Sequence, residues 1–140
     1  MELVSPSQKI YLTRSAIAHA GRGVFAATHI EKGEIIEHCP IIEIQENEAP
    51  LLKQSELVNY YFIWGDDKKK VAICLGFGSL YNHSYEPNAT YRKLYDEQFI
   101  DFVALKKIGR GEEITINYNY GNPDDKSPLW IKSIPPFSPR

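Results

Sequence analysis

The sequence predicts a mostly β fold made of many short strands. Segments of strand length that are rich in β-branched and aromatic residues recur along the chain, and turn-forming Gly, Pro, Asn and Asp residues separate them at short intervals. No apolar stripe with the helical period extends beyond about two turns, and the chain contains no internal repeat. These observations favour small β-sheets over a helical bundle or a repeat architecture.

The first elements alternate between strands and turns. Residues 9–13 alternate as a half-buried strand, and small residues lead from there into a tight glycine turn at 21–23. Residues 35–44 form a strongly apolar strand, in which Pro40 indicates an edge or a bulge.

The middle of the chain begins with an acidic segment at 45–56. This segment is the best candidate for a variable insert, with one short helical turn around residues 51–53. Further strands are expected, in chain order, at 57–64, 71–75, 90–95 and 99–105. The aromatic strand at 57–64 turns at residues 65–67, so it forms a hairpin with the strand that follows it.

Length and composition indicate one globular domain. The chain has 140 residues, 43% hydrophobic and 24% charged, so it can bury a sizeable core. We expect a single domain over residues 1–140, with residues 1–7 as an N-terminal extension and residues 122–140 as a C-terminal tail. No apolar run reaches membrane-spanning length and no secretion signal is seen, so we expect no membrane partner and an intracellular location. That location is cytoplasmic or nuclear, or the host nucleus for a viral or pathogen protein.

The net charge and the cysteine content limit which binding partners and cofactors are expected. The formal net charge is −2 and no basic stripe carries interleaved aromatics, which argues against nucleic acid. Only Cys39 and Cys74 are present and neither has a paired metal spacing, so we expect no metal site and no disulfide scaffold. His19, His29 and His38 lack a metal partner at useful spacing and are assigned no role.

The stretch 76–88 has the composition of a backbone docking site. Two glycines allow close approach of another backbone or of a ligand. Asn82, His83 and Ser84 then place three short hydrogen-bonding side chains just before a Pro-Asn turn.

Its expected counterpart is the stretch 111–121. A turn glycine precedes a β-branched strand that carries Tyr118 and Tyr120. In an extended strand these two tyrosines lie on the same side, so one strand would direct two phenols together.

These two stretches, with residues 21–26, resemble the SET domain family of protein lysine methyltransferases. Three motifs occur in the order of that family: a G-x-G turn followed by an apolar pair, N-H-S followed by P-N, and G-E-E-I-T-I-N-Y near the end. The resemblance covers residues 8–131 and looks most like the compact stand-alone SET proteins of large algal viruses and some microbes. It implies a pseudoknot-like threading of the N-H-S segment with the tyrosine segment.

The resemblance implies S-adenosylmethionine as the cofactor and a lysine ε-amine as the methyl acceptor. Tyr118 matches the catalytic tyrosine of the family. Arg22 and Gly23 match main-chain contacts to the cofactor, and Asn82 and His83 match further cofactor contacts. For His83, a scaffold role and a role as general base are both open, and the scaffold is favoured.

Four further roles follow from the same resemblance. Tyr60, with Tyr61 as the open alternative, and Tyr120 would line the lysine channel. Ile116 occupies a position that helps to decide how many methyl groups fit, and an isoleucine there predicts di- or trimethyllysine. Trp130 lies where compact SET proteins place an aromatic lid over the adenine or the channel.

The expected chemistry needs alignment more than acid-base power. A lysine amine has a free pKa near 10.4, so holding it neutral near pH 7 costs about 4 to 5 kcal/mol in water. An apolar channel and a neighbouring sulfonium both disfavour the ammonium and reduce that cost. Tyrosines suit such a channel because their rings exclude water and a phenol can orient the amine without carrying a charge.

The sequence departs from the chromatin-associated branch of the family in two ways. Tyr85 follows N-H-S where many nuclear members have a cysteine, and no C-x-C cluster follows the tyrosine strand, so we expect the zinc-binding element of that branch to be absent. The leading hypothesis is a protein lysine methyltransferase that acts on a protein with an exposed lysine, such as a histone-like basic tail, as a monomer or homodimer. The rival hypothesis is a SET-fold module that binds a peptide or nucleotide without turnover.

Overall fold

The computed structural model describes residues 3–119 and 122–129. In chain order the elements are β1 (Ile10–Arg14), β2 (Arg22–Ala26), β3 (Ile35–Ile44), α1 (Ala49–Lys53), the 3-10 helix η1 (Glu56–Asn59), β4 (Tyr61–Trp64), β5 (Lys70–Cys74), the 3-10 helix η2 (Gly78–Leu80), β6 (Asn82–His83), β7 (Ala89–Leu94), β8 (Phe99–Ala104) and β9 (Glu113–Ile116). The predicted mostly β class is confirmed.

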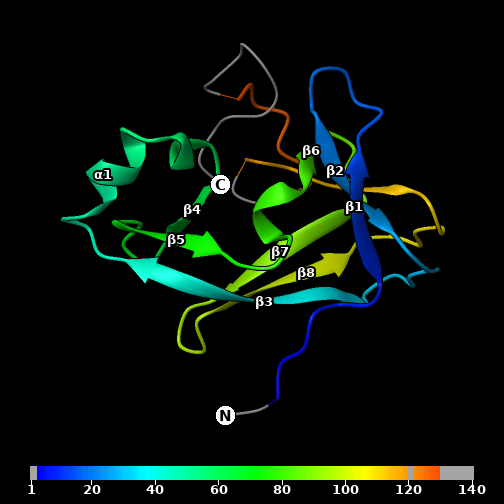
Figure 1. Cartoon of the computed structure of the whole chain (residues 1–140), viewed down its shortest axis with the longest axis horizontal. Coiled ribbons are helices and arrows are strands. Elements are labelled where there is room, and N and C mark those ends of the chain that lie inside the picture. The colour runs from blue at the N-terminus through cyan, green and yellow to red at the C-terminus, as the bar shows by residue number, and fades with distance from the viewer. Residues whose placement is uncertain (1–2, 120–121, 130–140) are drawn as a thin grey trace.

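The strands form two sheets. One has the order β1-β2-β9-β6 and the other has the order β4-β5-β3-β8-β7. Figure 1 shows the first sheet at one end of the molecule and α1 at the other end, beyond β4 and β5. All pairings are antiparallel except β6 with β9, which run parallel.

Strand β3 joins the two halves of the larger sheet. Its first part, from Ile35 to Pro40, pairs with β8, and its last part, from Ile41 to Ile44, pairs with β5. Pro40 lies where the partner changes, and the ladder shifts register between Ile35 and Glu37. The expectation of an edge or a bulge at Pro40 is therefore wrong, because β3 lies between β5 and β8 and its register shift is at residues 35–37.

The two outer strands of the larger sheet, β4 and β7, approach each other. Phe62 packs edge-on against Tyr91 with ring centroids 5.2 Å apart, and Trp64 packs edge-on against Tyr95 at 4.8 Å. Between these two aromatic pairs Nζ of Lys93 donates to the main-chain carbonyl of Ile63 at 2.6 Å. Side chains thus fasten the two outer strands to each other.

One predicted strand is only half formed. Residues 57–64 were expected to be extended, but the first of them belong to η1, and β4 begins at Tyr61. Ser55 caps η1 by accepting from the main-chain N–H of Leu57 at 3.2 Å, and Asn59 donates to Glu56 at 3.0 Å. These local side-chain bonds offer the backbone a helical turn that an apolar pattern cannot reveal. The short helical turn predicted at 51–53 is confirmed as part of α1.

The glycine turn also begins earlier than predicted. Of Gly21 and Gly23, Gly21 is the one with a positive φ, of 75°, and its carbonyl accepts from the main-chain N–H of Ser15 at 2.8 Å. Arg22 and Gly23 already belong to β2, where they pair with Arg14 and Thr13. Within the described residues, no helix is long and apolar enough to cross a membrane.

Candidate functional site

The two predicted docking stretches lie side by side. Strand β6 pairs with β9, with Asn82 opposite Thr115 and His83 opposite Ile116. Asn88 fastens the same strand from the other end of its motif: its Oδ1 accepts from the main-chain N–H of Thr115, and its Nδ2 donates to the carbonyl of Glu113, both at 2.9 Å. The N-H-S and P-N motifs therefore clamp β9 along its length.

Asn82 connects the clamp to the glycine motif. Its Nδ2 donates to the carbonyl of Arg22 at 3.0 Å and to Oε2 of Glu113 at 2.8 Å. Oε1 of Glu113 in turn accepts from the hydroxyl of Ser15 at 2.7 Å. Two acceptors facing the nitrogen fix the orientation of the amide, so its oxygen is the atom that faces elsewhere and can accept from a ligand.

Gly23 is required by this network. A Cβ at Gly23 would lie 2.3 Å from Oε2 of Glu113 and 2.9 Å from Nδ2 of Asn82. The side chain of Arg22 is exposed, and only its carbonyl takes part. A cavity of about 320 Å³ lies beside this turn and is lined by Leu12, Thr13, Arg14, Gly21 and Arg22.

His83 acts on the backbone of Tyr118. Its Nδ1 accepts from the main-chain N–H of Tyr118 at 3.0 Å, which places the ring proton on Nε2. Burial lowers the pKa of His83 to about 4, so the ring is neutral at physiological pH. This geometry favours the scaffold role over the role of general base.

Nε2 of His83 is buried and has no hydrogen-bond partner among the described residues. A buried N–H without an acceptor is uncommon in folded proteins and requires an explanation. The ring of Tyr85 stands edge-on to the His83 ring, with centroids 4.4 Å apart. A polar group of a ligand at this point would satisfy the orphaned donor.

Tyr118 is buried, but it does not lie on the strand. β9 ends at Ile116 and Tyr118 lies in a turn, so the prediction that one strand carries Tyr118 with Tyr120 is wrong. Asn117 makes the turn by accepting from the main-chain N–H of Asn119 at 2.9 Å and donating to the carbonyl of Asp125 at 2.6 Å. These bonds replace the strand ladder, and Tyr120 itself lies outside the described residues.

The phenol of Tyr118 is held by the docking stretch. It donates to the main-chain carbonyl of Tyr81 at 2.5 Å. Tyr81 is completely buried, and its own phenol donates to Oε1 of Glu37 at 2.9 Å. Oε2 of Glu37 accepts from the main-chain N–H of Phe77 at 2.9 Å. Sequence patterns do not reveal the roles of Ser15, Glu37, Tyr81 and Glu113, because the partners of these residues are far away in the chain.

The predicted substrate residues have different surroundings. Tyr60 is half-buried and its carbonyl accepts from the hydroxyl of Ser79 at 3.0 Å, which brings it next to η2. Tyr61 is 2% exposed and packs in a small apolar cluster with Leu52 of α1, which favours Tyr60 of the two. Ile116 is fully buried in the main core, and Trp130 lies outside the described residues.

The described residues contain no group of three or more His, Cys, Asp and Glu side chains that could hold a metal ion. Both cysteines are buried thiols. The hydrogen bond with the neighbouring Cys74 thiol, together with burial, raises the pKa of Cys39 far above its ordinary value, so this thiol stays protonated.

Comparisons with known proteins agree with the motifs. The SET domain family matches residues 21–119. The histone-lysine N-methyltransferase of Schizosaccharomyces pombe described as H3 lysine-37 specific is 33% identical over 99 residues, which cover 70% of this chain and 66% of that protein. The Halocynthia roretzi histone-lysine N-methyltransferase SETD7 is 23% identical, over 91% of this chain and 37% of that protein. This chain therefore spans less than two thirds of the length of both relatives.

Solved structures have the same fold. A crystal structure of a candidate histone methyltransferase from Plasmodium falciparum has a TM-score of 0.62 and 32% identity, over 84% of this chain and 96% of that one. A structure of ctPRC2 bound to S-adenosylmethionine has a TM-score of 0.71 and 23% identity, over 84% of this chain and 16% of that one. The fold and the clamped tyrosine define a SET domain. This chain belongs to the SET domain family.

Proposed function

We propose that the protein transfers methyl groups from S-adenosylmethionine to the ε-amine of lysine in a protein substrate. The observation that carries the proposal is the placement of Tyr118. Its phenol is buried and bonded to the Tyr81 carbonyl, and its main chain is bonded to His83, directly beside the N-H motif. A fixed, uncharged phenol beside the N-H motif is an arrangement that suits methyl transfer to a neutral amine.

The residues present fit the cofactor. S-adenosylmethionine supplies a methyl group on a positively charged sulfur. The Asn82 oxygen would accept from the ammonium of the cofactor, and the orphaned Nε2–H of His83 would gain an acceptor. Arg22, which lines the cavity at the turn, and Gly23, which follows it, would contribute main-chain groups. Trp130 is proposed as an aromatic lid.

The acceptor lysine would enter a channel lined by Tyr60 and Tyr120 and closed by Tyr118. Aromatic walls keep water out, which lowers the free-energy cost of holding the amine neutral. Ile116 carries no hydroxyl that could hold a water in the place of a methyl group. We therefore propose that the protein forms di- or trimethyllysine.

A basic protein tail is the proposed substrate. Two relatives are named as histone-lysine methyltransferases, and the insert carries exposed carboxylates at Glu46, Glu48 and Glu56 that would attract Lys and Arg. Methylation of such a substrate would take place in the nucleus or the cytoplasm. The oligomeric state is proposed as a monomer or a homodimer.

The experiment combines cofactor binding with turnover. The full chain is heated with S-adenosylmethionine or S-adenosylhomocysteine, and both should raise its melting temperature. It is then incubated with basic protein mixtures and S-adenosylmethionine, and mass spectrometry should find methylated lysines. Stabilisation by both nucleosides without any methylated product would favour the binding module. No stabilisation by either would refute the proposed cofactor.

A further inference from the structure

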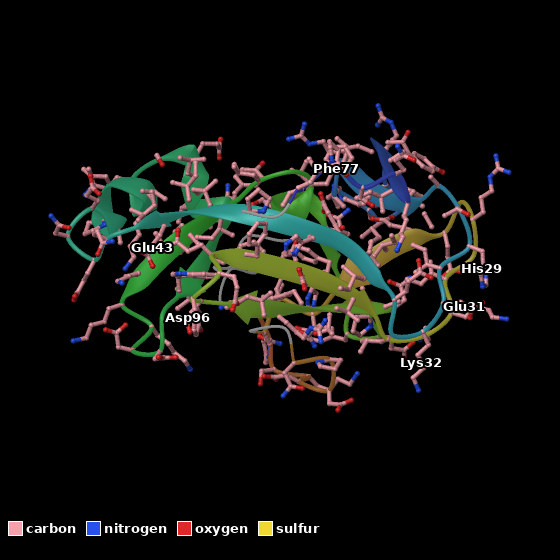
Figure 2. The ribbon with its side chains drawn as sticks, turned by 90° about the horizontal axis from the view of Figure 1, so that it is seen from below. His29, Glu31, Lys32, Glu43, Phe77 and Asp96 are labelled. Atoms are coloured by element: carbon pink, nitrogen blue, oxygen red, sulfur yellow. The ribbon has the colours of Figure 1, made fainter. Side chains whose placement is uncertain are left out.

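A second cavity, of about 310 Å³, lies on another part of the molecule. It is lined by the N-terminal segment 4–7, by Ile10 of β1, by residues 37–40 of β3 and by Gly76 and Phe77. Figure 2 shows Phe77 next to the ribbon of β1, in agreement with the presence of both Ile10 and Phe77 in the lining. No residue that bonds directly to Tyr118 or faces the proposed cofactor lines this cavity. Its one link to that site is Glu37, which accepts from the phenol of Tyr81.

Glu37 gives this cavity its chemical character. The residue is only 8% exposed, and its two oxygens accept from the phenol of Tyr81 and the main-chain N–H of Phe77, both neutral donors. Within the described residues Glu37 forms no ion pair. A carboxylate removed from water without a countercharge is costly, and a cation brought next to it removes much of that cost.

The other polar side chains of the lining are those of Ser5, Ser7 and His38, and His38 is hydrogen-bonded to Asp101. Most of the remaining lining is apolar. Apolar side chains come from each segment that lines the cavity: Val4, Pro6, Ile10, Pro40 and Phe77. Their combination with one buried carboxylate is the pattern of a small-molecule site, in which apolar walls supply contact and one polar group sets orientation. The volume lies at the lower end of the range of about 300–1,000 Å³ that is usual for such sites.

We propose that this cavity binds a small organic cation, a primary ammonium on a compact apolar body, with the ammonium against Glu37. Each carboxylate oxygen accepts more than one hydrogen bond, so the ammonium adds donors without displacing Tyr81 or Phe77. The apolar body covers Ile10 and Phe77. Segment 4–7 forms the outer wall, with Ser7 tied to the sheet by a hydrogen bond from its hydroxyl to the carbonyl of Ile36 at 2.7 Å.

The site is connected to Tyr118 through a single residue. Tyr81 holds Glu37 with its phenol and holds Tyr118 with its carbonyl. An ammonium on Glu37 weakens the carboxylate as an acceptor for the Tyr81 phenol, so occupancy of the cavity is transmitted to the Tyr118 phenol. This coupling rests on the proposed function, whereas binding to the cavity does not.

Nuclear magnetic resonance titration of the full chain tests the binding, with benzylammonium as the probe at neutral pH. Saturable shifts are expected at the amides of Ser7, Cys39, Gly76 and Phe77. Benzyl alcohol, which has the same shape without the charge, should bind at least about tenfold more weakly, the scale of a charge-assisted hydrogen bond. Equal affinity for the two probes, or no saturable shift at these amides, would overturn the proposal.

Two variants and a control locate the site. Glu37→Gln removes the charge, and Ser5→Trp fills the cavity from an exposed residue without touching Glu37; each should abolish the preference for benzylammonium. Glu97→Gln, at an exposed turn, should bind like the natural chain. If Glu37→Gln unfolds the protein, the Ser5→Trp result decides, and unchanged binding by Ser5→Trp refutes the site.

A further probe separates two sources of the ammonium. Nα-acetyl-lysine amide carries a primary ammonium at Nε on a longer and less compact stem, and it should bind more weakly than benzylammonium. Tighter binding of the lysine derivative would overturn the assignment to a compact amine. In a methylation assay, saturating benzylammonium should change turnover, while benzyl alcohol should not; shifts at the cavity without a change in turnover would refute only the coupling.

Discussion

The main-chain N–H of Tyr118 donates to Nδ1 of His83 at 3.0 Å, so the histidine of the N-H-S motif holds the residue that is expected to act on the substrate. The bond requires a neutral ring, because a protonated Nδ1 cannot accept. His83 therefore positions Tyr118 only while it is unprotonated. Acid that protonates Nδ1 should therefore break this contact.

This relationship predicts a specific pH dependence of stability. The pKa of His83 is lowered by burial from 6.5 to about 4. Between these values the unfolded chain takes up a proton at this residue and the folded chain does not, so the free energy of unfolding falls as the pH drops from 6.5 to about 4. His83→Asn, whose Oδ1 can accept in place of Nδ1, should show a flatter dependence in urea unfolding across this window. His19→Asn, at an exposed residue with a positive φ, is the control and should keep the natural slope.

Tyr118→Phe should separate catalysis from folding. The change removes one oxygen and its bond to the Tyr81 carbonyl, which costs about 1 kcal/mol of stability. Methyl transfer should fall by about two orders of magnitude or more, the scale that is lost with one oriented polar group. Tyr85→Phe, which loses a phenol bonded to the Ser127 carbonyl, is the matched control and should remain active. Near-normal turnover by Tyr118→Phe would refute the catalytic assignment.

Asn82 and Arg22 should differ strongly in their effect on the cofactor. Asn82→Ala removes the oxygen that is proposed to accept from the cofactor, and it leaves the Arg22 carbonyl and Oε2 of Glu113 without the Asn82 donor, so cofactor binding should weaken by about 1 to 3 kcal/mol. Arg22→Ala keeps the carbonyl and removes an exposed side chain, so it should have little effect. Calorimetry with S-adenosylhomocysteine measures both, and the opposite order of affinities would contradict the site.

Gly23→Ala should damage the same site by a steric route. The added methyl would overlap Oε2 of Glu113 and crowd Nδ2 of Asn82, so this pair must separate and the Asn82 amide must turn. A loss of about 1 to 3 kcal/mol in cofactor affinity is expected from the broken bond. Gly109→Ala is the control, because its nearest contact, Oε1 of Glu112, lies at an ordinary 3.6 Å. Equal cofactor affinity in the two variants would rule out this role for Gly23.

Ile116 is the test of product multiplicity. The natural protein should continue past monomethyllysine when the cofactor is in excess, and Ile116→Tyr should shift the product toward monomethyllysine by adding a hydroxyl and bulk. Because Ile116 is fully buried, the larger ring should also cost about 1 to 3 kcal/mol of stability. Mass spectrometry of the product gives the ratio, with Ile116→Leu as a size-matched control. A natural protein that stops at monomethyllysine would contradict the proposal.

The sequence predicts elements well where one local signal dominates. The continuous apolar run gives β3 with its observed ends at Ile35 and Ile44, and turn residues give the β4–β5 hairpin. The prediction of a strand fails at residues 57–60, because Ser55 caps the 3-10 helix η1 there and this cap competes with the strand pattern. It fails again at Tyr118, because the partner of its N–H is a histidine 35 residues earlier.

The site was only partly predictable for the same reason. The motifs identify Asn82, His83 and Tyr118, and the pairing of β6 with β9 brings these residues together. Glu37 and Glu113 carry no local sign of their role, since the hydrogen-bond partners of their carboxylates lie between 31 and 98 positions away. The missing Cβ at Gly23 is the one signal that indicates a close neighbour, and the sequence does not say that this neighbour is Glu113.

The place of β9 between β2 and β6 has a consequence for how the chain folds. β2 and β6 do not pair with each other, so the four-stranded sheet cannot form until residues 113–116 have been made. A nascent chain on the ribosome can therefore complete the hairpins of the larger sheet early. Residues 22–23 and 82–83, in contrast, cannot be brought together until β9 has been synthesised. Contacts that join such distant segments slow folding. Cofactor-binding capacity should accordingly appear last during synthesis, after most of the core is already in place.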